Sequence, residues 1–63
     1  MPMTYRDAAR LIYRKGGVFK EHGKRHDTFE MPWGTLIRVP RHSGDFSKGV
    51  EKDIKDRANG DKL

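Results

Sequence analysis

The chain has no cysteine among its 63 residues. Disulfide bonds and thiolate metal ligands, which stabilise many domains of this size, are therefore excluded. No apolar stretch approaches the ~18 residues that a membrane-spanning helix needs, and the first residues, MPMTYRDAAR, lack the apolar segment of a signal peptide. We expect a soluble cytoplasmic protein that forms one domain over residues 1–63.

Hydrophobic residues are also scarce, at 33% of the chain, whereas 37% of the residues are charged. The net charge is +5, and the whole excess lies in residues 1–44, which contain nine Lys or Arg and four Asp or Glu. The remaining residues are balanced, with five of each sign. This distribution favours a polyanion such as a nucleic acid as partner. The alternative is a solvated basic surface that only keeps the protein in solution.

The spacing of apolar residues predicts the order α-β-β-β-α. Thr4 and Ser47 are suitable caps for two helices, and Gly16-Gly17 and Gly60 are suitable stops. The predicted ranges are 5–15 and 48–58 for the helices, and 18–22, 26–31 and 35–39 for the strands. Short turns join the strands, which indicates an α+β fold with a three-stranded antiparallel sheet and two helices on one face.

Strand alternation predicts which side chains face the core. In the first strand we expect Phe19 to face inward and Val18, Lys20 and His22 to face outward. In the second strand, one face holds Asp27, Phe29 and Met31 and the other holds His26, Thr28 and Glu30.

The stretch HGKRHDTFEMPWG contains the best candidate for chemistry, His26, which follows Lys24 and Arg25 directly. RNA supplies its own nucleophile, the 2′-OH, so a nuclease needs a group that transfers protons near pH 7 and cations that stabilise the phosphate. His26 therefore meets the minimum for a catalytic residue, and a surface histidine on the polar face of the strand is an equally open interpretation. The candidate phosphate contacts are Lys20, Lys24, Arg25, Arg38 and Arg41.

The other chemistry-bearing residues give weaker signals. His42 is interpreted as a loop histidine, and His22 either approaches His26 across the hairpin or fills the strand face. Trp33 could stack on a base, although covering a turn is the preferred interpretation. No HExxH motif, His pair at helical spacing or nucleophile signature is present, so we expect no metal site and no cofactor.

Five stretches, in order and over nearly the whole chain, carry a family resemblance. They are YRDAARLIYRKGG, GKRHDTF, MPWGT, IRVPRH and SGDFSKGVEKDIKDRANG. In this order they resemble a first helix ending in Gly, a Gly–x–x–His or Gly–Ser–His element, a turn, a strand ending in Val-Pro and a histidine, and a last helix. The chain thus resembles the HicA-type toxins, the mRNA interferases of type II toxin–antitoxin systems.

The resemblance implies a fold similar to a double-stranded RNA-binding domain and metal-independent cleavage of mRNA by one histidine at the start of the second strand, here His26. It also implies a HicB-type antitoxin that covers the active site, and contact with operator DNA only indirectly through that antitoxin. Two other functions stay open: a non-catalytic RNA-binding module of the same fold, and a basic adaptor for an acidic protein partner. No membrane partner is expected.

Overall fold

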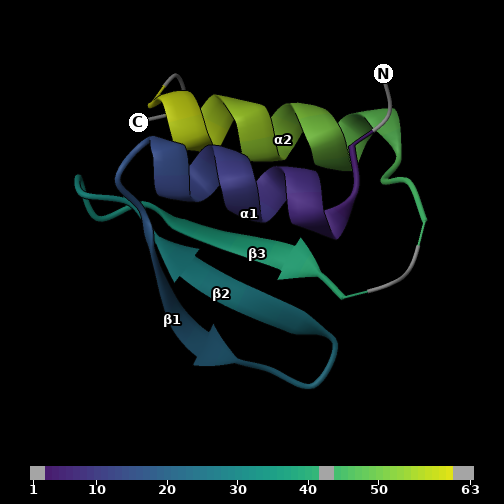
Figure 1. Ribbon diagram of the computed structural model, residues 1–63, viewed down its shortest axis with the longest axis horizontal. Coiled ribbons are helices and arrows are strands. Elements are labelled where there is room, and N and C mark those ends of the chain that lie inside the picture. The colour runs from purple at the N-terminus through teal and green to yellow at the C-terminus, as the bar shows by residue number, and fades with distance from the viewer. Residues whose placement is uncertain (1–2, 42–43, 61–63) are drawn as a thin grey trace.

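The computed structural model describes residues 3–41 and 44–60 (Figure 1). The elements are α1 (Tyr5–Arg14), β1 (Val18–His22), β2 (His26–Glu30), β3 (Leu36–Pro40) and α2 (Lys48–Asn59). The strands form one antiparallel sheet in the order β1-β2-β3, and both helices lie on the same side of it (Figure 1). The predicted α+β fold, with its order α-β-β-β-α and its two helices on one face, is therefore confirmed. Neither helix in the described ranges has the length and apolar character needed to cross a membrane.

The ends of α1 follow from local sequence. Thr4 and Asp7 form a capping box, in which each side chain accepts a hydrogen bond from the other residue's main-chain N–H. The helix ends one residue earlier than predicted. The two glycines that follow, Gly16 and Gly17, are required for different reasons. Gly16 has a φ of +91°, whereas a Cβ on Gly17 would lie 2.5 Å from Cγ2 of Ile12. The second glycine therefore lets the chain turn closely past the helix.

The second helix, α2, begins and ends where its caps predict. The Ser47 hydroxyl accepts a hydrogen bond from the Val50 N–H at 3.3 Å, and Gly60 ends the helix in the left-handed region at φ +78°. Ile54 and Ala58 form its buried stripe. The prediction for this helix is confirmed, with one further residue at its C-terminal end.

The core lies between the helices and the inner face of β2 and β3. Phe29, 1% exposed, lies among three other aromatic rings, with centroid distances of 5.7 Å to Tyr13, 5.7 Å to Phe19 and 6.5 Å to Tyr5. The buried hydrophobic residues of the described ranges are Met3, Ala8, Ile12, Phe29, Met31, Ile37, Val39, Phe46, Ile54 and Ala58. Both helices cover this same face of the sheet, and no other described helix covers the opposite face.

The alternation predicted for the second strand is confirmed, but the prediction for the first strand is partly wrong. Phe19 pairs with Phe29 on the inner face as expected. The register then shifts at Lys20, which is an extra residue in β1, so that His22 pairs with Asp27. A β-bulge of this kind reverses the alternation that follows it. His22 therefore lies on the inner face with Asp27, and not on the outer face with Val18.

Candidate functional site

His26 lies at the first position of β2, on the face of the sheet that no helix covers. It is exposed, and its strand partner in β3 is Pro40. Two adjoining hollows of about 360 and 390 Å³ share His26, Lys24 and Arg25 as lining residues, and we call them the His26 hollows. The structure thus brings the predicted catalytic histidine together with the cations that precede it.

Two more of the predicted phosphate contacts line these hollows. Arg38 lines the larger one and Arg41 lines the smaller one, while Glu21 is the only acidic residue among the described residues of either lining. Lys20 lines neither of them; its Nζ pairs with a Glu30 carboxylate oxygen at 3.4 Å. Four of the five predicted cations therefore surround His26, and the fifth lies elsewhere on β1.

The cations around His26 differ in what they already bind. Lys24, Arg25 and Arg38 are exposed and make no ion pair or side-chain hydrogen bond with any residue in the described part of the chain. Arg41 is only 27% exposed, and its Nη1 contacts Oδ1 of Asp27 at 2.7 Å. Three positive charges are therefore available to a ligand at once, whereas the fourth is already matched by a carboxylate.

Asp27 is the one buried charged residue in the described ranges, at 5% exposed. The Tyr5 hydroxyl from α1 donates a hydrogen bond to Oδ2, and Arg41 donates one to Oδ1. These two bonds, that of Tyr5 first, hold the pKa of Asp27 below its ordinary value although burial opposes the shift. Burial and the neighbouring carboxylate together raise the pKa of Tyr5 to about 12. The phenol therefore stays protonated and remains a donor.

The bulge in β1 brings His22 to the same carboxylate. Its Nδ1 lies 3.0 Å from Oδ1 of Asp27 and 3.3 Å from Nη1 of Arg41. Both hydrogens of that Nη1 are directed to closer acceptors, the carbonyl oxygen of Gly23 at 2.5 Å and Asp27 at 2.7 Å. We therefore assign Nδ1 of His22 as a donor to Asp27, which leaves Nε2 of an imidazole ring that is 69% exposed facing solvent.

The two histidines of the hairpin do not converge on one ligand. His22 lies on the inner face with Asp27, and His26 lies on the outer face. No hydrogen bond from the His26 ring to another described residue is present. One histidine is held by a buried carboxylate, and the other is surrounded by cations. His42, the third histidine, lies outside the described residues.

Tyr5, Asp27, Arg41 and His22 form a group that we call the Asp27 cluster. The charge pattern of the sequence does not reveal this cluster, although the strand alternation contains one signal of it. The alternation places Asp27 on the apolar face together with Phe29 and Met31. A carboxylate on a buried face requires hydrogen-bond donors or a cation. The alternation therefore indicates that another part of the chain supplies such a donor, and Tyr5 and Arg41 are the residues that do so.

Trp33 lies away from His26. It belongs to the turn between β2 and β3, at the opposite end of β2, and is 42% exposed. Its ring makes no ring-to-ring contact with any aromatic residue in the described segments. Because Trp33 and His26 lie at opposite ends of β2, Trp33 cannot stack on a base that is bound directly beside His26.

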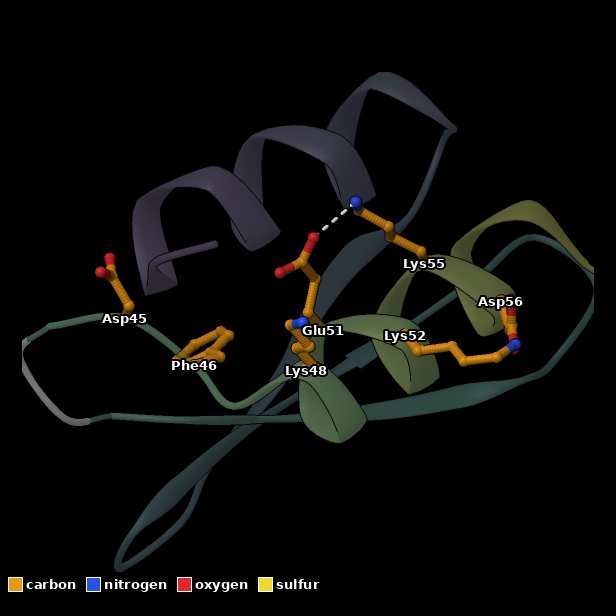
Figure 2. A pocket seen from close by; sticks show the side chains of 7 residues that line it. All are labelled: Asp45, Phe46, Lys48, Glu51, Lys52, Lys55 and Asp56. Carbon is orange, nitrogen blue, oxygen red and sulfur yellow. Dashed lines mark hydrogen bonds and ion pairs between the residues drawn. The ribbon is translucent and has the colours of Figure 1, made fainter. Parts of the chain in front are cut away.

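Another hollow, at about 710 Å³ larger than either of the His26 hollows, lies along α2 and not beside His26 (Figure 2). Its wall carries three lysines and three acidic residues, and Figure 2 shows Lys55 directed toward Glu51, which it contacts at 2.6 Å. Lys52 and Asp56 form a second pair at 2.9 Å. The charged side chains among the described residues of this wall therefore balance, and together they favour neither an anion nor a cation.

No group of three or more His, Asp or Glu side chains within the described ranges is arranged to hold a metal ion. No family model matches the chain, and a search of curated proteins finds no relative. The geometry around His26 is therefore the main indication of what the protein does.

Proposed function

We propose that this protein is a small endoribonuclease that cleaves mRNA without a metal ion, the toxin of a HicA-type toxin–antitoxin system. One observation carries the proposal: an exposed imidazole, His26, lies between hollows whose walls carry the uncommitted cations Lys24, Arg25 and Arg38. Such a surface attracts a phosphodiester backbone, and the imidazole is the group in it that transfers protons near neutral pH.

In this proposal the three cations hold the phosphate and stabilise the extra negative charge that develops as the 2′-oxygen attacks phosphorus. His26 takes the proton from the 2′-OH or gives one to the departing 5′-oxygen. A single histidine transfers one proton at a time, so water completes the other transfer. Cleavage by such a site is slow, because one positioned acid–base group supplies about 10²- to 10⁴-fold of acceleration.

The same proposal includes the location of the protein and its partners. The toxin acts in the cytoplasm, and a HicB-type antitoxin with an acidic surface neutralises it by covering the His26 hollows. Contact with operator DNA is then made by the antitoxin. The net charge of +5 and the uncovered face of the sheet are compatible with such a partner.

His26→Ala tests the enzyme, and His22→Ala is its matched control, because the control removes an exposed histidine from the same hairpin but from the opposite face. Purified variants are incubated with a long single-stranded RNA, and intact RNA is followed over time. We expect His26→Ala to lower the cleavage rate by about 10²-fold or more while RNA binding persists. His22→Ala should cleave within about threefold of the wild type.

The other outcomes separate the alternatives. Cleavage that survives in His26→Ala but is lost in His22→Ala would move the site to the Asp27 cluster. RNA binding without cleavage by the wild type would identify a non-catalytic RNA-binding module. A wild type that binds no RNA at all would favour a basic adaptor for an acidic protein. Induced expression of the same variants, with growth and RNA integrity followed, checks the result in cells.

A further inference from the structure

Arg41 ties the end of β3 to the turn between β1 and β2. Its main-chain N–H donates to the carbonyl oxygen of Arg25 at 3.0 Å. Its guanidinium donates from Nη1 to the carbonyl oxygen of Gly23 at 2.5 Å and from Nη2 to that of Lys24 at 2.6 Å. One residue therefore binds three successive carbonyl oxygens of the turn that carries the cations next to His26.

The same guanidinium also donates a hydrogen bond from Nη1 to Oδ1 of the buried Asp27 carboxylate, at 2.7 Å. Asp27 in turn accepts a hydrogen bond from the Tyr5 hydroxyl of α1. The turn is thus connected through Arg41 and Asp27 to the helical layer. Within the described ranges, acceptors are present for three of the five guanidinium hydrogens, including both on Nη1, so the fork formed by Nη1 and Nη2 is not available to a phosphate.

We propose that Arg41 is a positioning residue of the RNA site and not one of its phosphate ligands. It holds the turn so that Lys24 and Arg25 point their charges to the phosphate bound at His26. This inference rests on the proposed binding of RNA at the His26 hollows, and it removes Arg41 from the phosphate contacts that charge alone suggested.

The hydrogen bonds of Arg41 indicate how its replacement by lysine affects the turn. Arginine reaches several acceptors at once because its donors are spread over a planar fork, whereas lysine carries a single point charge. Without the fork the turn samples more conformations, and RNA binding has to order the turn again. Retaining the positive charge alone should therefore not preserve RNA affinity.

The test is a double-mutant cycle in His26→Ala protein, in which RNA is bound but not cut. The probe is a mixed-sequence single-stranded RNA oligonucleotide at fixed ionic strength. We expect Arg41→Met and Arg41→Lys to weaken binding to a similar extent, about tenfold, which is the order of coupling within one contact network. When Lys24→Met and Arg25→Met are already present, Arg41→Met should change the affinity by less than about twofold.

Two results would overturn the proposal. If Arg41→Lys binds RNA as tightly as its parent, the charge of Arg41 is what matters, and the residue contacts phosphate. If Arg41→Met weakens RNA binding by the same factor with and without Lys24→Met and Arg25→Met, the residues act independently.

Tyr5→Phe controls for a general loosening of the fold, since it removes another hydrogen-bond donor to Asp27 and leaves the contacts of Arg41 with the turn in place. All binding is measured well below the melting temperature of each variant. Tyr5→Phe should melt at a lower temperature yet bind RNA within about twofold of its parent. If it weakens binding as much as Arg41→Met does, the effect of Arg41 is not specific to the turn and the proposal fails.

The binding cycle and the cleavage assay fail separately. A wild type that binds RNA with the expected coupling but does not cut it overturns the nuclease proposal and supports the role of Arg41. A protein that cuts RNA but shows independent losses in the cycle supports the nuclease and overturns the role of Arg41. A parent that does not bind RNA overturns both.

Discussion

Replacement of Phe29 by leucine tests how the sheet is fixed to α1. Phe29 is 1% exposed and has edge-to-face contacts with Tyr13 and Phe19, both with centroids at 5.7 Å and with interplanar angles of 75° and 87°. Each such pair contributes about 0.5–1.5 kcal/mol beyond its buried area. Leucine fills most of the space but makes neither contact, so we expect Phe29→Leu to lower the free energy of unfolding by about 2 kcal/mol.

A loss of this size is large for a chain of 63 residues, whose total stability is expected to be about 3–9 kcal/mol. It corresponds to a fall in melting temperature of about 8–16 °C in a domain of this length. Thermal and urea unfolding followed by circular dichroism measures both quantities. The melting temperature should fall without a loss of helical signal at low temperature.

Phe19→Leu is the matched control, because the same substitution is made at a residue that is 46% exposed and contacts one ring, that of Phe29. We expect it to cost less than about 1 kcal/mol. If the two variants lose equal stability, or if Phe29→Leu changes it by less than about 0.5 kcal/mol, Phe29 is not the centre of the aromatic cluster.

Two further predictions concern charge. The Tyr5 hydroxyl has a pKa of about 12 in the folded protein, whereas an unfolded tyrosine loses its proton at about pH 10. The stabilisation that comes from this difference in pKa is therefore fully present below pH ~10 and is lost as the pH rises from ~10 to ~12. Urea midpoints of Tyr5→Phe should lack this fall, and an equally steep fall in the variant would contradict the assignment. For RNA, contacts by Lys24, Arg25 and Arg38 alone predict a slope of log K against log salt of about −2 on single strands, from about −0.7 per contact. A titration with sodium chloride that gives about −3.5 would mean that all five predicted cations bind phosphate.

The features predicted from sequence are those that neighbouring residues decide. A cap needs only a hydroxyl or carboxylate within three residues of the helix start, as Thr4 and Asp7 provide in α1 and Ser47 provides in α2. The alternation in β2 needs only one buried face, and Phe29 and Met31 mark it. These interactions are short in sequence, so the elements and the order α-β-β-β-α could be predicted without knowledge of the packing.

The features that sequence did not predict depend on contacts across the fold. The bulge at Lys20 is set by the register of β1 against β2, and no glycine or proline marks it. The role of Arg41 depends on Asp27, 14 residues earlier. Counting charges treats Arg41 and Arg25 as equal, whereas the structure shows one held by a carboxylate and the other exposed.

Arg41 therefore connects the Asp27 cluster to the turn that carries Lys24 and Arg25. Of the two groups, only the residues around His26 face the proposed ligand. If Asp27 is replaced by a residue without a carboxylate, the guanidinium of Arg41 loses its ion pair and is no longer fixed against the carbonyl oxygens of the turn. The residues that would relax are those that Arg41 holds, and they include Lys24 and Arg25. A substitution at Asp27 should consequently impair RNA binding without touching RNA, and loss of activity alone cannot identify a residue as a ligand. The distinction requires binding and stability to be measured on the same variants.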